Sequence, residues 1–130
     1  MMTTEPVILP PTSTVAEALA HIRQEERPPA IAAQVYVTRP PSETPTGRFL
    51  GMAHFQRLLR EPPSTLLGSV IDITVDPIRP ELTVHEVAAY LATYNLVAVP
   101  VVDELSRLLG AVTVDDVLDH MLPEDWRERP

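Results

Sequence analysis

The chain contains an internal duplication, and this feature limits its possible folds more than any other. Two sets of residues recur later in the chain, one at a spacing of 69 residues and the other at a spacing of 59. The sets are Pro11, Thr14, Val15 and Glu17 with Pro80, Thr83, Val84 and Glu86, and Arg48, Leu50, Gly51 and Leu59 with Arg107, Leu109, Gly110 and Leu118. The second spacing is shorter because the polar, proline-rich segment 39–47 is replaced in the second copy by the shorter segment 103–107. The chain is therefore expected to fold as one structural unit made twice.

Each copy predicts the same order of elements. A threonine followed three residues later by a glutamate, at Thr14 and Glu17 and again at Thr83 and Glu86, is a capping box that starts a helix. Short apolar runs after each helix predict strands, and a second helix closes each copy. The remaining expected elements are extended entries at 6–9 and 73–78, strands at 30–37, 49–53, 97–102 and 108–112, a helical turn at 64–67, and closing helices at 54–60 and 113–121. The expected fold class is α/β (α+β), with a β-α-β-β-α unit made twice.

Neither copy is expected to fold alone, because about sixty residues with one exposed sheet face bury too little apolar surface to offset the loss of chain entropy. We therefore expect two three-stranded sheets packed sheet to sheet about a pseudo-two-fold axis, with clefts where their interface meets solvent. The expected units are residues 6–68, with the long turn at 39–47, and residues 69–122, followed by a tail at 123–130.

Composition excludes several classes of function. A net charge of −8 argues against binding polymeric nucleic acid, since a basic face supplies most of that affinity. The absence of cysteine excludes disulfides, thiolate metal sites and cysteine nucleophiles. No apolar run is long enough to insert into a membrane, and residues 1–11 lack the pattern of a signal peptide. A cytoplasmic location is therefore expected.

The segment 108–118 is the strongest candidate for a binding site. It predicts an apolar strand that runs without a loop into a helix starting at Thr113. The free N–H groups and positive dipole end of such a helix can hold a phosphate, and Asp116 could accept hydrogen bonds from two neighbouring hydroxyls, such as those of a ribose. Thr113 and Asp116 are also close to a capping box, which stabilises a helix start without any ligand. The residues alone leave both interpretations open.

Catalytic and metal-binding patterns are weaker. An enzyme is the least expected class, because no nucleophile, base and orienting group occur together. Asp115 and Asp119 lie one turn apart on the expected helix and share a face, as oxygen ligands of Mg²⁺ would require. The alternative is a solvated acidic helix start that is favoured by the helix dipole.

The runs 97–103 and 107–118 resemble the second half of a CBS domain. With the duplication, the chain resembles a tandem CBS domain pair, also called a Bateman module, over residues 6–122. Its sequence is most similar to the cytosolic CBS region of MgtE-type magnesium transporters. The resemblance is specific in the second copy and looser in the first.

The resemblance implies a regulatory domain that binds an adenosine nucleotide, AMP, ADP or ATP, in a cleft between the repeats. Thr113 would contact phosphate and Asp116 would bind the ribose hydroxyls. The adenine would lie against Ser13, Ala18, Ala30, Ile31 and Ala111. The resemblance also implies a homodimer that controls a transporter or enzyme domain of a larger chain. The alternatives are a structural dimerisation module without a ligand, and a Mg²⁺-responsive transporter fragment that uses Asp115 and Asp119.

The first copy departs from the family pattern at the matching junction. His54 stands where Thr113 stands in the second copy, and Arg57 stands where Asp116 stands. An arginine side chain has only donors and cannot accept hydrogen bonds from ribose hydroxyls. The first junction is therefore not expected to bind a nucleotide in the usual way, although Arg57 could hold a phosphate.

Overall fold

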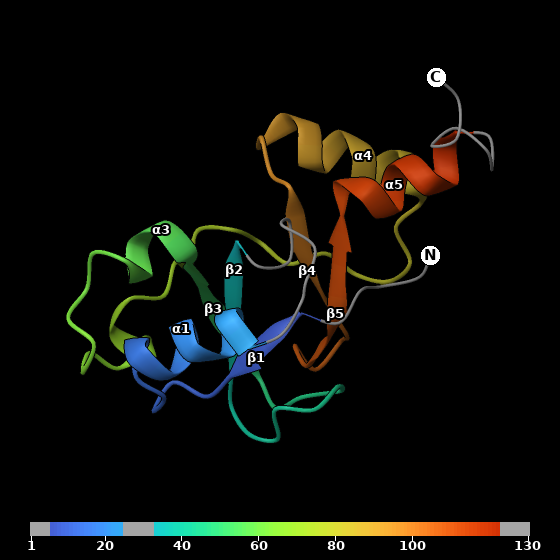
Figure 1. Cartoon of the computed structure of the whole chain (residues 1–130). Helices are drawn as coiled ribbons and strands as arrows, with labels where there is room; N and C mark the ends of the chain where they lie inside the picture. Colours follow the sequence, from blue (N-terminus) through green and yellow to red (C-terminus); the bar gives the residue numbers. More distant parts are fainter. Residues whose placement is uncertain (1–5, 25–32, 123–130) are drawn as a thin grey trace.

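The computed structural model describes residues 6–24 and 33–122, and these form two halves that share the order helix, strand, strand, helix (Figure 1). The first half contains β1 (Val7–Leu9), α1 (Val15–Gln24), β2 (Gln34–Thr38), β3 (Phe49–His54), α3 (Phe55–Leu58) and the 3-10 turn η1 (Leu67–Ser69). The second half contains α4 (Val84–Thr93), β4 (Ala98–Val102), β5 (Leu108–Thr113) and α5 (Val114–Met121). The predicted α+β class is confirmed. The turn expected at 64–67 lies at η1 instead.

The two sheets are unequal. In the first sheet β1 is parallel to β2, and β2 is antiparallel to β3. The second sheet contains only the antiparallel pair β4 and β5. The strand expected at 73–78 is reduced to one parallel bridge between Ile78 and Val101. Pro77 and Pro80 flank Ile78, and proline cannot donate a hydrogen bond to a neighbouring strand, so the prediction of a full third strand was wrong.

The predicted capping boxes are present. Thr14 Oγ1 accepts a hydrogen bond from Glu17 N, and Glu17 Oε1 accepts one from Thr14 N, both at 3.2 Å. Thr83 and Glu86 make the same reciprocal pair, with both distances at 3.1 Å. These side chains satisfy backbone N–H groups that the first turn of a helix leaves without partners.

Helix α3 is shorter than the sequence predicts. It covers four residues rather than 54–60, and the side chain of its N-cap residue His54 makes no capping hydrogen bond. Pro62 disfavours the helical conformation for Glu61, which precedes it. A helix without a cap and with an early stop signal therefore remains a single turn.

Each half has its own apolar core, and a third cluster joins the halves. The first core includes Val15, Val35, Leu58 and Leu67, and the second core includes Val87, Leu91, Val99 and Val112. The joining cluster brings Tyr36 and Met52 of the first sheet together with Val102, Leu108 and Ala111 of the second. The two sheets therefore pack against each other, as predicted.

The matched glycines of the two copies have almost the same backbone conformation. Gly51 on β3 has a φ of 156° and Gly110 on β5 has a φ of 157°. At Gly51, an added Cβ would lie 2.9 Å from the carbonyl oxygen of Asp72. Asp72 also pairs with Met52 through backbone hydrogen bonds of 2.7 and 3.2 Å. The edge of β3 is therefore covered by the segment that links the halves.

The long turn at 39–47 forms hydrogen bonds with the second half. Thr46 is only 1% exposed, and its Oγ1 accepts a hydrogen bond of 3.0 Å from Leu108 N. Thr46 N donates a second hydrogen bond, of 3.1 Å, to Leu108 O. Phe49 N donates to Ser106 O at 2.8 Å beside this pair. The extra residues of the first copy thus supply contacts across the interface.

We expect Thr46→Val to lower the free energy of unfolding by about 1–2 kcal/mol, because it keeps the side-chain shape but leaves Leu108 N–H buried without its hydroxyl partner. Urea denaturation measures the change. Thr12→Val is the control, because Thr12 is exposed and such surface changes alter stability by roughly 0.5 kcal/mol or less. Equal stability of the wild type and Thr46→Val would show that the Thr46 hydroxyl does not stabilise the interface.

Candidate functional site

Strand β5 runs directly into α5, as predicted, and Thr113 stands at the junction. Thr113 is 4% exposed and its Oγ1 accepts a hydrogen bond of 3.1 Å from Asp116 N. Thr113 N donates one of 2.8 Å to Asp116 Oδ2, which completes a capping box. Val114 N donates to Val97 O at 3.0 Å and ties the helix start to the residue before β4. The capping interpretation of this motif is therefore confirmed.

Capping leaves chemical capacity for a ligand at the same two residues. A hydroxyl has one donor and two acceptor lone pairs, so Thr113 can accept from Asp116 N and still donate to a phosphate oxygen. A carboxylate offers about four acceptor positions, so the bond from Thr113 N does not by itself use up those of Asp116. Capping and nucleotide binding are thus compatible in hydrogen-bonding terms.

The other predicted contacts with adenine are spread over the fold. Ala111 lies on β5, two residues before Thr113, and is fully buried in the joining cluster. Ala18 is fully buried in the first core and has no surface to offer to a ligand. Ser13 is also buried in the first half, where its carbonyl accepts a hydrogen bond from Leu67 N at 2.8 Å. Ala30 and Ile31 lie outside the described residues.

The predicted metal ligands Asp115 and Asp119 are exposed on α5. Within residues 6–24 and 33–122, no three histidine or acidic side chains gather closely enough to hold a metal ion. Asp103, near the other end of β5, closes the turn between β4 and β5 instead: its carboxylate accepts hydrogen bonds from Leu105 N, Arg107 N and Arg107 Nε. These bonds, with that from Arg107 N the largest cause, hold the pKa of Asp103 below its ordinary value.

The matching junction in the first half is occupied by other interactions. His54 Nε2 lies 3.1 Å from Asp72 Oδ2. Asp72 Oδ1 accepts hydrogen bonds from Thr74 Oγ1 at 2.6 Å and Thr74 N at 2.8 Å. The Thr74 side-chain hydrogen bond is the largest cause of a lowered pKa for Asp72, followed by the Thr74 backbone bond. Arg57 Nε pairs with Glu61 Oε1 at 2.9 Å.

A cleft of about 360 Å³ opens beside this first junction. It joins the end of the first sheet to the loop between α4 and β4, and its lining consists of Ala33, Gln34, His54, Phe55, Gln56, Asn95, Leu96 and Val97. Sequence reasoning placed His54 here but missed Gln34 and the segment 95–97. Gln34, a glutamine in a mostly apolar strand, was the one feature of the sequence that could have indicated this cleft.

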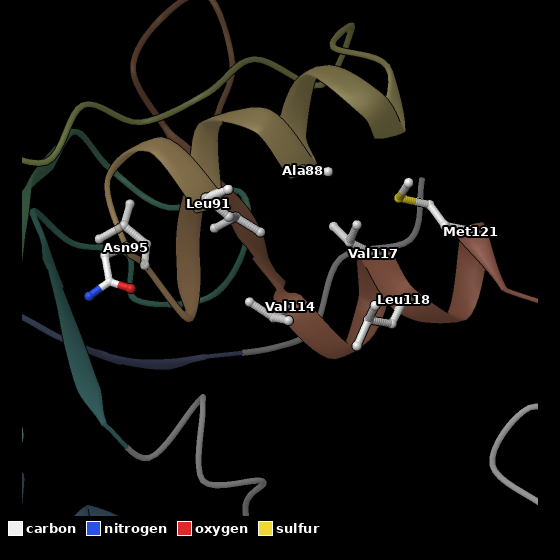
Figure 2. Close-up of a pocket in the computed structure, with 9 residues that line it drawn as sticks. Ala88, Leu91, Asn95, Val114, Val117, Leu118 and Met121 are labelled. Carbon is white, nitrogen blue, oxygen red and sulfur yellow. The ribbon is translucent and has the colours of Figure 1, made fainter.

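A second, more apolar hollow of about 310 Å³ lies between α4 and α5, which contact each other (Figure 2). Figure 2 shows Ala88 and Leu91 of α4 and Val114, Val117, Leu118 and Met121 of α5 around it. We call this hollow the α4–α5 groove. Asn95 and Leu96 line both this groove and the cleft beside His54. Tyr94 and Leu122, which lie close by in sequence, are also exposed apolar residues.

A sequence profile for the family described as "CBS domain" matches residues 1–64 and 68–123. The chain belongs to the CBS domain family. It is 34% identical over 119 residues to the magnesium transporter MgtE of Thermus thermophilus, and 28% identical over 119 residues to the MgtE of Enterococcus faecalis. Each alignment covers 92% of this chain and 25% of the relative, so the chain spans about a quarter of the length of these curated relatives.

Several solved structures share the fold of this chain. The cytosolic domain of the Mg²⁺ channel MgtE in complex with ATP is 32% identical, with a TM-score of 0.77 over 93% of this chain and 47% of that chain. The soluble part of a magnesium transporter is 27% identical, with a TM-score of 0.76 over 92% of this chain and 45% of that chain. The CBS domains of a transcriptional regulator from Streptococcus pneumoniae, 20% identical with a TM-score of 0.72 over 87% of this chain and 86% of that chain, share the fold. In the part of this CBS pair that the structure describes, no helix has the length and apolar character needed to cross a membrane.

The lowered pKa of Asp72 predicts that the stability of the CBS pair falls in acid. Its folded pKa lies below the ordinary 3.8, so its stabilisation is complete above that value and is lost as the pH falls through the lower folded pKa. Asp72→Asn is expected to have a lower melting temperature than the wild type at pH 7, because a neutral amide accepts weaker hydrogen bonds than a carboxylate. The difference should shrink as the pH falls through the lowered folded pKa of Asp72, because the wild-type carboxylate is then protonated. Thermal unfolding from pH 7 to pH 2 tests this, with Asp76→Asn, an exposed acid of the same segment, as the control. A difference that does not depend on pH would contradict it.

Proposed function

We propose that this CBS pair is a regulatory ligand-sensing module that binds an adenosine nucleotide at the junction of β5 and α5. The observation that carries the proposal is the contrast between the two junctions. The second junction holds a hydroxyl and a carboxylate at the start of a helix of eight residues, whereas the first holds a histidine bound to Asp72 and an arginine paired with Glu61. The ATP complex of the related MgtE cytosolic domain supports an adenosine nucleotide as the ligand class.

The geometry suggests how each group would act. The N-terminus of α5 supplies backbone N–H groups and a positive dipole end for a phosphate, and Thr113 donates its hydroxyl proton to a phosphate oxygen. Asp116 accepts hydrogen bonds from the ribose hydroxyls. By the family resemblance, the base would lie against the segment containing Ala30 and Ile31. We leave Ser13, Ala18 and Ala111 out of the proposed contacts because all three are buried.

Binding would regulate a partner only if the nucleotide favours one conformation over another. Helix α5 packs on α4, and Val114 N is bonded to Val97 O, so a shift at the start of α5 would reach both α4 and β4. The MgtE relatives suggest that the regulated partner is a magnesium transport domain at the cytoplasmic side of a membrane. Control of transport is part of this proposal.

We further propose that a second copy of the chain covers the α4–α5 groove, as expected for a CBS pair that forms a homodimer. The groove is lined by apolar side chains and Asn95. Tyr94, Val114, Met121 and Leu122 add exposed apolar surface in and near it. An apolar surface of this kind is typical of an interaction site, and a two-fold dimer would place the same patch on both sides of the interface.

Ala92→Glu is expected to convert the dimer into a monomer, because it would place a carboxylate in an apolar interface. Ala89→Glu is the matched control: Ala89 is also exposed on α4 but does not line the groove. Both changes have the same small effect on helix propensity. Sedimentation velocity measures the oligomeric state. A wild type that stays monomeric at its highest soluble concentration would contradict the proposed dimer.

Calorimetric titration with AMP, ADP and ATP, with and without Mg²⁺, tests the nucleotide site. We expect Asp116→Ala to weaken binding by at least about tenfold, since it removes charge-assisted hydrogen bonds to the ribose. Glu86→Ala is the matched control, because Glu86 has the same place in the capping box of α4. Both variants lose a helix cap, but only Asp116→Ala should lose affinity.

The other outcomes separate the alternatives. No heat with any nucleotide at millimolar concentration would favour a structural dimerisation module, whose Thr113 and Asp116 only cap a helix. Binding that Asp116→Ala leaves unchanged would place the ligand in another cleft. A response to Mg²⁺ without nucleotide, lost in the double variant Asp115→Asn/Asp119→Asn, would favour a Mg²⁺-responsive transporter fragment.

A further inference from the structure

Two turns at one end of the molecule bring three arginines together. Arg48 pairs with Arg107 in an antiparallel bridge between the halves, and Arg39 N donates a hydrogen bond of 2.9 Å to Arg48 O. Arg48 therefore lies between the other two, and all three are exposed. We call these three residues the arginine row. It lies where the turns 39–47 and 103–107 meet, at the end of the sheets opposite to α3 and α5 (Figure 1).

The duplication puts two like charges directly opposite each other. Arg48 and Arg107 are matched residues of the two copies, 59 positions apart, so each is paired with its own counterpart at the pseudo-two-fold axis. Side chains of directly opposite residues extend from the same face, and like charges there destabilise the pair. A negative charge beside this bridge would therefore stabilise it.

The second copy supplies such a charge and the first copy does not. Asp103 is the first residue after β4, and its Oδ2 accepts a hydrogen bond of 2.8 Å from Arg107 Nε. The first residue after β2, the matching strand, is Arg39. A second guanidinium thus stands beside Arg48 where a carboxylate stands beside Arg107. Within the described part of the chain, neither Arg39 nor Arg48 forms an ion pair.

The other acids nearby leave this excess of positive charge in place. Glu43 and Glu104 lie in the two turns, are exposed, and form no ion pair with any described arginine. Asp76 lines a hollow of about 170 Å³ that Arg48 and Ser106 also line. A carboxylate in this lining repels an anion inside the hollow. The arginine row itself is therefore the surface that can hold an anion.

We propose that the arginine row binds a doubly charged phosphate group, either inorganic phosphate or the phosphate of a monoester. A guanidinium presents a planar fork of donors that matches phosphate oxygens. A phosphate monoester carries about −1.5 to −2 charges at pH 7, which corresponds to the two guanidiniums of Arg39 and Arg48 that have no acidic partner. A single carboxylate would neutralise only one of them. This site is separate from the junction at Thr113 and does not depend on nucleotide binding there.

A phosphate in this position would also join the two halves. Arg39 and Arg48 belong to the first half and Arg107 to the second, beside the hydrogen bonds between Thr46 and Leu108. Because a ligand that binds only the folded state stabilises it, phosphate is expected to raise the melting temperature.

The measurement is the set of arginine Nε–Hε signals in two-dimensional ¹H–¹⁵N spectra of the whole chain. Inorganic phosphate and glycerol 3-phosphate are the probes, at constant ionic strength because salt screens exposed charges. We expect saturable shifts at Arg39, Arg48 and Arg107 and at the Leu108 amide. Dimethyl phosphate is the matched control, because it has the same phosphate centre but only one charge.

Two variants test the role of the row. Arg48→Gln is expected to weaken phosphate binding by about tenfold, the effect of one charge-assisted hydrogen bond. Arg39→Asp is expected to abolish binding, because it gives the first copy the carboxylate that Asp103 supplies in the second. Arg60→Gln is the control: Arg60 is an exposed arginine outside the row, and its removal lowers the net charge by the same amount as Arg48→Gln.

Vesicles of phosphatidylcholine with and without phosphatidic acid distinguish a lipid headgroup from a soluble phosphate. Sedimentation with the phosphatidic acid vesicles, lost in Arg48→Gln and kept in Arg60→Gln, would support a headgroup as the source. Binding of the two soluble probes without sedimentation would support a soluble phosphate.

Four results would overturn the proposal: no saturable shift with either soluble probe at millimolar concentration together with no sedimentation, equal binding of dimethyl phosphate, equal loss of affinity in Arg60→Gln and Arg48→Gln, or shifts confined to the start of α5. The wild-type map stands by itself if a variant is unstable. Asp116→Ala should bind phosphate at the row as the wild type does. This variant therefore distinguishes a failure of the nucleotide site from a failure of this one.

Discussion

The contact between the two sheets is the constraint on which the rest of the fold depends. Tyr36 and Met52 cover one side of this contact, and Leu108 and Ala111 cover the other. The second sheet has only two full strands, so it could not hold its position without the first half. Because Ala111 lies two residues before Thr113, the same contact fixes the point at which α5 begins. The candidate nucleotide site is thus positioned by the packing between the two sheets.

The two junctions show how a duplicated scaffold can keep its geometry while its chemistry changes. Gly51 and Gly110 have almost the same φ, so both strands enter their helices with a similar backbone. The second junction gains a capping box and a helix of eight residues, whereas the first lacks a cap and ends after one turn. His54 instead contacts Asp72 of the linking segment. The two junctions therefore differ in chemistry at matching positions: the second has a capping box, and the first has a contact with the linking segment.

Local sequence signals predicted the elements well because capping and strand periodicity depend on neighbouring residues. The boxes at Thr14 and Thr83 start helices as expected, and β5 differs from its predicted range by one residue. The strand expected at 73–78 failed because prolines limited its pairing. Thr46 was expected only in a polar turn, and its bond to Leu108 joins residues 62 positions apart. The cleft lining combines Gln34 of the first half with residues 95–97 of the second. Its composition follows from the tertiary fold, and the glutamine inside an apolar strand indicated only one side of it.

The loop between α4 and β4 lines both the groove and the cleft beside His54, and it is bonded to the start of α5. Asn95 adopts a left-handed conformation with a φ of 54°, and Leu96 N donates to Leu91 O at 2.9 Å, so the helix end is closely defined. Val97 O then accepts from Val114 N. A partner in the groove would contact Asn95 and Leu96, and a nucleotide at Thr113 would act on Val97 through the Val114 amide. Coupling between such sites is reciprocal: if a nucleotide at Thr113 strengthens dimer formation, dimer formation must strengthen nucleotide binding by the same factor.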